Sequence, residues 1–195
     1  MKLYYSKTSP YARKVLLLGK SLGMDIEVVL ANPLDNGEAL IAANPLNKVP
    51  ALVLDDGRCL IDSPIICEFL LDMAGRPRSG DDYFDNLQIQ AITDGILDAA
   101  LALVMEGRRD DSEKSAYWQD RWRLAIKRAL AHLEQRWLDK LHSWNSATIA
   151  TACTLDYLLF RLPDVTWQDD HPALARWFGE VSGNADFLST NPRDA

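Results

Sequence analysis

The first 75 residues alternate short strand-like and helix-like segments. Residues 2–5 form a short, partly aromatic strand candidate, and residues 10–21 have the composition of a helix that Gly23 terminates. Residues 25–30 alternate and are β-branched, which is typical of a strand. The remaining predicted elements are a short helix at 38–43, a hairpin of 51–54 and 58–61 around an Asp-Asp-Gly turn, and a helix at 63–73. This order, βαβαββα, predicts an α/β sandwich with a mixed sheet.

The second half has helical periodicity and no convincing strand. Long helices are predicted over 83–106 and 113–141, and two shorter helices over 148–161 and 172–182. In the second long helix, apolar residues recur at steps of three or four and predict a stripe that faces the core. The stripe consists of Trp118, Trp122, Ile126, Ala129, Leu133, Trp137 and Leu141. The second half is therefore predicted to be an all-α bundle of four or five helices.

A Gly/Pro/Ser stretch at 75–80 separates the two halves, and the charge changes at the same place. Residues 1–80 contain nine basic and nine acidic side chains, so residues 81–195 carry the whole net charge of −7. We read the stretch as a linker between a domain at 1–75 and an all-helical domain at 81–195. An acidic chain without a basic stripe disfavours nucleic acid as a partner.

Composition indicates a soluble globular protein that needs neither a disulfide nor a metal ion to stabilise its core. The chain has 195 residues, of which 48% are hydrophobic and 25% charged. Its purely aliphatic runs, such as Val15–Leu18, are far short of the ~18 apolar residues that span a bilayer. The N-terminus shows no apolar signal region, and the three cysteines form no close pair. We therefore expect a cytoplasmic location, no membrane partner and no disulfide.

The usual motifs of hydrolases and metalloenzymes are missing from the sequence. His132, His142 and His171 are scattered, and no two of them have the spacing of metal ligands on one element. The sequence contains neither a Gly-x-Ser-x-Gly elbow nor a P-loop. Structural roles are expected for all three histidines, and no metal is expected.

Two Ser-Pro pairs mark predicted helix starts. Ser9-Pro10 follows the first strand and Ser63-Pro64 follows the last one, each with Ser as N-cap and Pro at the first helical position. Taken singly, each pair is more often a cap than a site. In the predicted sandwich, however, both helices begin at the carboxyl ends of strands, where helix dipoles and free amides favour an anion. Two such anchors at one edge suit a ligand that carries both a thiolate and a carboxylate.

A third segment, Asn44-Pro45-Leu46-Asn47-Lys48-Val49-Pro50, precedes the third strand. Pro50 is a candidate for a cis peptide bond, which would turn the backbone of Val49 outward. An outward amide and carbonyl pair is what an extended peptide needs for strand-like pairing. The alternative, an ordinary trans turn proline, remains open on this segment alone.

In their order and spacing, these segments resemble the cytosolic glutathione S-transferases over essentially the full chain. Residues 9–13 are similar to the start of serine-type members, and also to the Cys-Pro start of omega-like members with Ser in place of Cys. Residues 44–52 resemble the cis-proline motif, 60–63 the Glu/Asp-Ser motif, and 171–177 the late helix start. The resemblance implies an N-terminal thioredoxin-like domain and a C-terminal helical domain.

The resemblance also implies roles for five residues. Ser9 matches the catalytic serine, whose hydroxyl donates a hydrogen bond to the glutathione thiolate. Val49 would pair through its backbone with the cysteinyl unit, and Lys48 would reach the glycyl carboxylate. Asp62 would face the γ-glutamyl ammonium, while Ser63 and its amide would bind the carboxylate.

Other positions are left with two interpretations. Arg13 either supports the site electrostatically or is a surface residue of the first helical turn. Tyr5 is the only near competitor to Ser9. The second substrate is expected near Tyr11, residues 105–109 and the Trp118 region, where apolar side chains are more often core than pocket wall.

One departure from the family pattern concerns a helix cap. The sixth helix of the family opens with a Ser/Thr-x-x-Asp box, and here the matching stretch is Thr148–Thr151, with Thr at the aspartate position. The expected cost is about 1 kcal/mol if nothing replaces the cap.

The resulting hypothesis is an enzyme that activates glutathione, as co-substrate, for attack on small electrophiles. Peroxide reduction, isomerisation or lyase chemistry on the same site remains open, as does a non-catalytic binding module of the same fold. The resemblance further implies a homodimer.

Overall fold

The structure, a computed structural model, describes residues 1–194 and contains a four-stranded mixed sheet. The strands, in the spatial order β2-β1-β3-β4, are β1 (Lys2–Tyr5), β2 (Glu27–Leu30), β3 (Ala51–Val53) and β4 (Cys59–Leu60). β1 runs parallel to β2 and antiparallel to β3, and β4 is antiparallel to β3. The predicted mixed sheet and the order βαβαββα are confirmed.

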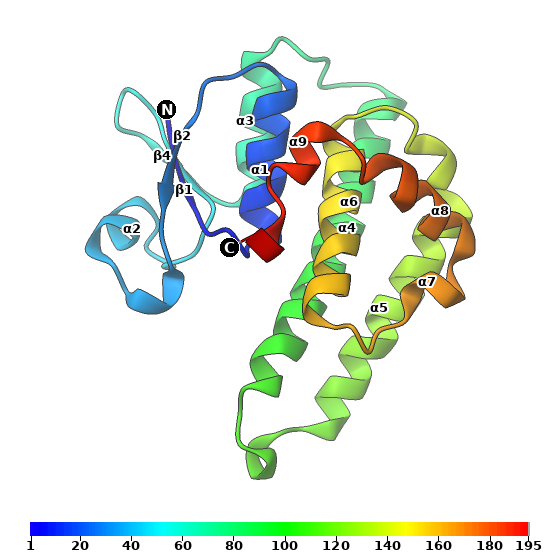
Figure 1. The fold of residues 1–195 in the computed structure, drawn as a ribbon. Coiled ribbons are helices and arrows are strands. Elements are labelled where there is room, and N and C mark those ends of the chain that lie inside the picture. Colours follow the sequence, from blue (N-terminus) through cyan, green and yellow to red (C-terminus); the bar gives the residue numbers. More distant parts are fainter. Residues whose placement is uncertain (195) are drawn as a thin grey trace.

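Helices cover both faces of this sheet. Helices α1 (Pro10–Ser21) and α3 (Ser63–Met73) lie on the face toward the helical half, and α2 (Glu38–Ala43) lies on the other face (Figure 1). The main core runs from the sheet through α1 and α3 into the helical half. A small separate cluster fills the space under α2, with Leu40, Ala43 and Ala51 as its buried members.

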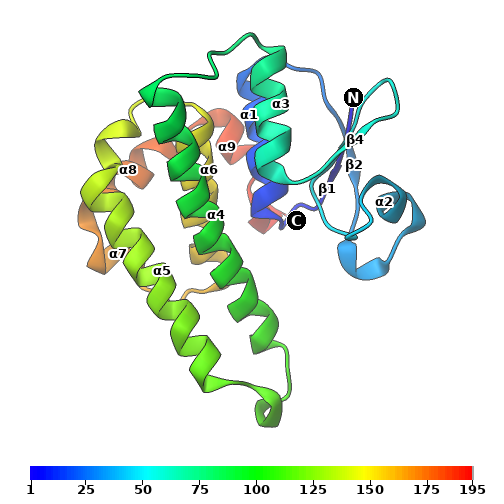
Figure 2. The same cartoon turned by 180° about the vertical axis from the view of Figure 1, so that it is seen from behind.

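The helical half is built on four main helices: α4 (Asp81–Gly107), α5 (Ala116–Arg136), α6 (Ser146–Arg161) and α8 (Pro172–Val181). Two short helices, α7 (Trp167–Asp170) and α9 (Ala185–Leu188), complete it. α4 and α5 form a long antiparallel pair that extends beyond the rest of the molecule (Figures 1 and 2). By length and composition alone α4 could cross a membrane, but it packs between α5 and α6 as a core helix.

α5 is shorter than the predicted helix over 113–141. It ends at Arg136, and a 3-10 turn over Leu138–Lys140 leads to the next helix. The predicted core role of Trp118 is also wrong, because this side chain is 47% exposed. The first turns of α5 lie in the part of the α4–α5 pair that extends past the shorter helices (Figure 2). Trp118 stacks there on Trp122 at 5.9 Å, whereas Leu133 further along the stripe is fully buried.

α6 begins two residues earlier than the sequence predicts, and it is capped. Asn145 is the N-cap, and its Oδ1 accepts the amide of Thr148 at 3.0 Å. The hydroxyl of Thr151 donates to the carbonyl of Ala147 at 2.8 Å. Asn is among the best N-cap residues, so Asn145 replaces the box and the cost expected in the absence of a replacement does not arise.

A buried ion pair holds α1 against α4. Lys14 is only 1% exposed, and its Nζ lies 2.7 Å from Oδ1 of Asp94. One turn earlier on α1, the hydroxyl of Tyr11 donates to Oδ1 of Asp98 at 2.6 Å. These contacts fix the N-terminal turn of α1 relative to the helical half.

Candidate functional site

The strand register brings three chain segments to one end of the sheet. Tyr4 of β1 pairs with Ala51, and Leu52 pairs with Leu60. The end of β1, the start of β3 and the end of β4 therefore lie side by side. The loop that leads to Ser9, the Val49–Pro50 bond and the start of α3 at Asp62 all follow from these ends. The sequence prediction that two helices begin at one edge of the sheet is confirmed.

Ser9 is the N-cap of α1. Its Oγ accepts a hydrogen bond from the amide of Ala12 at 3.2 Å, and Pro10 occupies the first helical position, as predicted. Since the hydroxyl uses a lone pair for the cap, its proton remains available for a ligand. Ser9 is partly exposed, and the positive end of the α1 dipole lies at the same point. The position suits an anionic acceptor such as a thiolate.

The Val49–Pro50 peptide bond is cis, as predicted. Asn44 holds the preceding loop, since its Nδ2 donates to the carbonyl of Lys48 at 2.8 Å. Within residues 1–194 the amide and the carbonyl of Val49 have no hydrogen-bond partner. Val49 thus presents a free donor and acceptor of the kind that an extended peptide pairs with. The side chain of Lys48 is exposed beside it.

The start of α3 differs in one respect from the prediction. Asp62, not Ser63, is the N-cap, and its Oδ1 accepts the amide of Ser63 at 2.6 Å. A carboxylate one residue earlier is the stronger acceptor, so it takes the cap position. The peptide bond between Ile61 and Asp62 is cis. The amide of Ser63 is therefore paired with Asp62, and another acceptor could bind it only in place of that side chain.

The hydroxyl of Ser63 is buried, with no partner among residues 1–194, while Asp62 is exposed. An unpaired buried hydroxyl costs stability unless a ligand satisfies it. Asp62 and Ser63 therefore offer a free negative charge and an unused hydrogen-bonding group at the same helix start.

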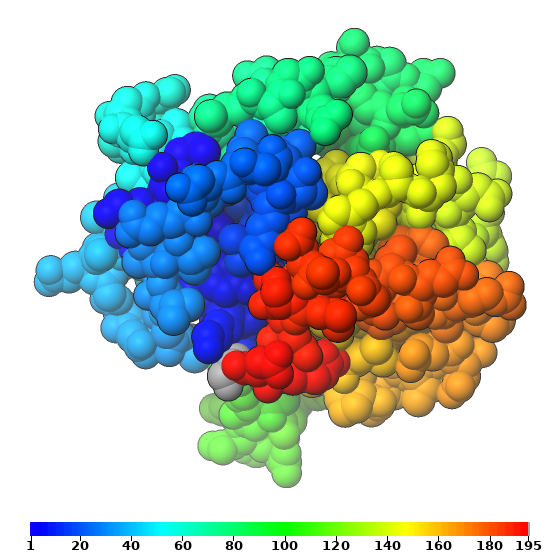
Figure 3. Space-filling view, turned by 45° about the horizontal axis from the view of Figure 1, so that its top comes forward, coloured from blue at the N-terminus to red at the C-terminus, as the bar shows by residue number. Residues whose placement is uncertain are grey.

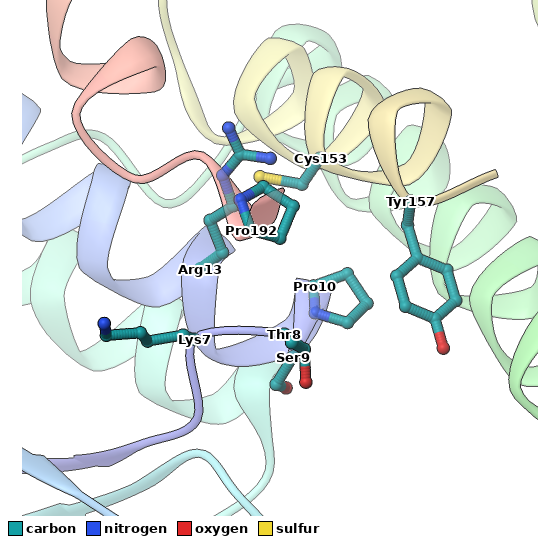
Figure 4. Close-up of a pocket in the computed structure, with 8 residues that line it drawn as sticks. All are labelled: Lys7, Thr8, Ser9, Pro10, Arg13, Cys153, Tyr157 and Pro192. Atoms are coloured by element: carbon teal, nitrogen blue, oxygen red, sulfur yellow. The ribbon is translucent and has the colours of Figure 1, made fainter. Parts of the chain in front are cut away.

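A small pocket adjoins Ser9 on the side of the helical half. Eight residues line it (Figure 4): Lys7, Thr8, Ser9, Pro10, Arg13, Cys153, Tyr157 and Pro192. Tyr157 projects from α6 toward the N-terminal end of α1, and its ring faces Pro10 (Figure 4). Our sequence prediction missed the α6 residues, although the step of four between Cys153 and Tyr157 places them on one helix face.

Arg13 has a structural role that neither sequence interpretation gave it. It is 3% exposed, so it is not a surface residue of the first turn. Its guanidinium forms a salt bridge with Asp156 of α6, donates to the carbonyl of Phe187 at 2.8 Å, and lies 3.9 Å from the centre of the Phe187 ring. Arg193 binds the other oxygen of Asp156 at 2.7 Å.

These bonds hold the C-terminal segment against α1. Figure 3 shows this segment in red, directly against the blue first half. Pro192 reaches the pocket beside Ser9 as a result. Arg13 therefore fixes both the start of α1 and the C-terminal segment, whose Pro192 lines the pocket.

Two other groups near Ser9 are poor candidates for thiol chemistry. Tyr5 is 5% exposed, and burial raises the pKa of its hydroxyl although the charge of Arg13 opposes the shift. Burial also raises the pKa of the Cys153 thiol to about 12, so this cysteine is not a thiolate at neutral pH. Neither group is exposed enough to meet a ligand. Ser9 is partly exposed and caps α1, so it is the candidate donor that combines exposure with the helix N-terminus.

Taken together, the fold and the edge define a thioredoxin-like domain, with free backbone groups of the kind that pair with an extended peptide, joined to a helical domain. A family model for the N-terminal domain of glutathione S-transferases matches residues 3–78. YibF of Escherichia coli K12, an uncharacterized GST-like protein, is 36% identical over the full length of both chains. The chain belongs to the glutathione S-transferase family.

Solved structures of the family are similar over nearly the whole chain. A glutathione transferase family member from Pseudomonas fluorescens Pf-5, with bound glutathione, is 36% identical, with a TM-score of 0.90 and 98% of each chain covered. A second structure from the same strain, with bound S-(propanoic acid)-glutathione, is 35% identical, with a TM-score of 0.88, and covers 98% of this chain and 99% of that one.

Proposed function

We propose that this protein is a glutathione transferase in which the hydroxyl of Ser9 stabilises the thiolate of bound glutathione for attack on a small electrophile. The domain at 1–75 binds glutathione, and the domain at 81–195 supplies one wall for the second substrate. The observation that carries the proposal is the shared edge of Ser9, Val49 and Asp62, in a family whose similar structures hold glutathione. We also propose a cytosolic location.

Each end of the tripeptide has a candidate partner at this edge. The backbone of Val49 pairs with the cysteinyl unit, and Lys48 meets the glycyl carboxylate. Asp62 binds the γ-glutamyl ammonium, while the amide and hydroxyl of Ser63 bind the adjacent carboxylate. The unpaired backbone groups of Val49 and the unpaired hydroxyl of Ser63 support this assignment.

The energy needed for thiolate formation is within reach of these groups. A thiol with a pKa near ~8.5 is only about 3% ionised at pH 7. Lowering the pKa by about two units makes roughly three-quarters of it thiolate and requires about 2.7 kcal/mol. A hydroxyl donating to a charged acceptor contributes about 1.5–3 kcal/mol, and a helix N-terminus about 0.3–1 kcal/mol. No general base is needed.

The proposal is tested by retention on immobilised glutathione, followed by an assay with an activated aryl halide. In that reaction the thiolate attacks the halogen-bearing carbon, the C–S bond forms, and halide leaves with the bonding pair. We expect both retention and turnover. A protein that binds glutathione but turns over no electrophile would contradict transferase activity, and one that does not bind glutathione would favour a non-catalytic module.

Replacing Asp62 with asparagine is expected to weaken glutathione binding about three- to tenfold, because the side chain loses its charge toward the ammonium group. Asparagine caps helices as well as aspartate does, so α3 should be retained. Calorimetry with glutathione and with its deaminated analogue separates the two effects. The variant should bind the deaminated analogue as the unmodified protein does, and an equal loss for both ligands would assign Asp62 a structural role only.

We further propose a homodimer that buries an apolar face on α3 and the start of α4. Ile65 is 55% exposed, Met73 54% and Phe84 63%. Ile65 and Met73 are eight residues apart and so lie on one face of α3. Phe84→Asp should give a monomer in size-exclusion chromatography with light scattering, whereas Leu124→Asp, an equally apolar change on exposed α5, should not. A wild-type monomer would contradict the proposal.

A further inference from the structure

One face of α4 continues past the point where α1 begins. Asp94 and Asp98 of α4 bind Lys14 and Tyr11 of α1. The acidic partners advance along α4 while their partners go back along α1, so the two helices are antiparallel at this contact. Residues of α4 that follow Asp98 on the same face therefore lie beyond the N-terminus of α1, on the side where Ser9 lies.

Those following residues are Leu101, Met105 and Arg108, at the three- and four-residue steps of a single helix face. Leu101 is partly exposed, and Met105 is 42% exposed. Arg108 is the C-cap of α4. The span from Leu101 to Arg108 is about 10 Å along the helix axis. The face thus offers an apolar stretch that continues past the start of α1 and ends in a cation.

α6 carries a matching face. Cys153, Tyr157 and Arg161 follow one another at steps of four, and the first two line the pocket beside Ser9 (Figure 4). Arg161 is the last residue of α6 and lies one turn beyond Tyr157 on the same face. α4 and α6 pack against each other. Two arginines therefore stand at the ends of two neighbouring helices, both beyond the pocket.

These arginines are not used by the fold as ion pairs. Among the described residues neither Arg108 nor Arg161 has a carboxylate within salt-bridge distance, although the helical half carries the whole negative charge of the chain. Arg161 stacks on the ring of Phe160 at 4.2 Å. Burial raises the pKa of the Tyr157 hydroxyl, and the charges of Arg161 and Arg108 oppose that shift. Both guanidinium groups thus act on one hydroxyl at the pocket.

The helix dipole explains the position of each arginine separately, but not the occurrence of the pair. A cation in the last turn of a helix interacts favourably with the helix dipole. That effect does not explain why two such residues, at the ends of two neighbouring helices, both act on the hydroxyl of Tyr157, which lines the pocket. Two unpaired guanidinium groups beside an apolar wall are the usual recognition elements for a carboxylate.

We propose that the second substrate is a small electrophile with an apolar body and a carboxylate remote from its reacting carbon. The body lies along Leu101 and Met105, and the carboxylate binds Arg108 and Arg161. The inference rests on the proposed transferase function, since it names the class of electrophile that the same site accepts. The proposed anion site is positive although the helical half as a whole is acidic, and the local charge is the one that a bound carboxylate meets.

The test compares a chlorodinitrobenzoate with the corresponding chlorodinitrobenzamide, which has the same reacting centre and no charge. In both, the glutathione thiolate displaces chloride from the ring carbon. Arg161→Gln should lower kcat/KM for the benzoate about tenfold and leave the benzamide within about twofold. Arg161→Lys should retain part of the preference, and the preference should shrink as salt concentration rises. Arg108→Gln should act in the same direction.

Arg76→Gln is the matched control. It removes the same charge from the exposed linker after α3, which lies beyond the end of α1 and away from its start (Figure 1), and it should change the rate with neither substrate. Equal losses for benzoate and benzamide in the Arg161 and Arg108 variants, or no loss in either, would overturn the inference while leaving transferase activity intact.

Binding of the two S-aryl glutathione conjugates, measured by calorimetry, gives a readout that does not depend on turnover. The carboxylate conjugate should bind more tightly than the amide conjugate, and only this difference should disappear in Arg161→Gln. If neither electrophile reacts, transferase function fails, and the conjugate comparison still decides on the anion site. Equal affinities of the unmodified protein for both conjugates would reject it.

Discussion

Replacing Ser9 with glycine is expected to raise the pKa of the bound glutathione thiol by about one to two units and to lower kcat/KM at neutral pH about ten- to a hundredfold. The hydroxyl is the donor whose loss removes the stabilisation of the thiolate, whereas the helix dipole remains. Glycine is the informative substitution because it costs an N-cap only a few tenths of a kcal/mol, while alanine costs about 1 kcal/mol. The change therefore tests the hydroxyl and spares α1.

The pH dependence of kcat/KM in Ser9→Gly should shift in a defined direction. Thiolate is the reactive form, so a higher pKa moves the rising limb of kcat/KM to higher pH, and the variant should regain activity in alkaline buffer. Titration of the thiolate by its ultraviolet absorbance measures the pKa directly, and Ser9→Thr should behave nearly as the unmodified protein. Glutathione affinity should stay close to normal. Coincident titration curves for the unmodified protein and Ser9→Gly would remove Ser9 from the chemistry.

Local signals were enough to predict the first half of the fold. Gly23, the Asp-Asp-Gly turn and the two Ser-Pro pairs mark boundaries through backbone preferences that neighbours do not alter. The second half depends more on tertiary contacts. Trp118 fits the apolar period of α5 but lies where no helix covers it, and this cannot be read from periodicity. Asn145 replaced the expected box because several nearby polar residues could each cap a helix.

The candidate site was predictable where one segment contains both the chemistry and its geometry. Ser9 is a cap in any helix that starts at Pro10, and Val49 precedes a proline whose cis bond could be proposed from its motif. Arg13 was misjudged because its partners, Asp156 and Phe187, lie far along the chain. The same reason hid Arg161, since only packing of α6 beside α1 brings its helix face to the pocket.

The largest effect on stability is expected from Asp94→Ala, which should cost about 3–5 kcal/mol of the free energy of unfolding. Lys14 is 1% exposed and binds both oxygens of Asp94, at 2.7 and 2.9 Å. Without Asp94, its buried ammonium group would lose the carboxylate that pairs with it. Urea unfolding measures the loss. The control is Asp82→Ala, an exposed carboxylate 3.9 Å from Lys140, whose removal should change stability by less than about 1 kcal/mol.

The substitution of the other partner, Lys14→Met, should lower the free energy of unfolding by less than Asp94→Ala does, and this loss should depend on pH. The side chain of Asp94 is 17% exposed, and burial raises its pKa even while the charge of Lys14 opposes the shift. Without Lys14 the pKa rises further, so the folded state binds the proton more tightly than the unfolded chain does, and stability grows as pH falls through that range. The variant should therefore lose less stability at pH 5 than at pH 8. A pH-independent loss, or one as large as that of Asp94→Ala, would show that the ion pair does not hold α1 against α4 in the way its geometry implies.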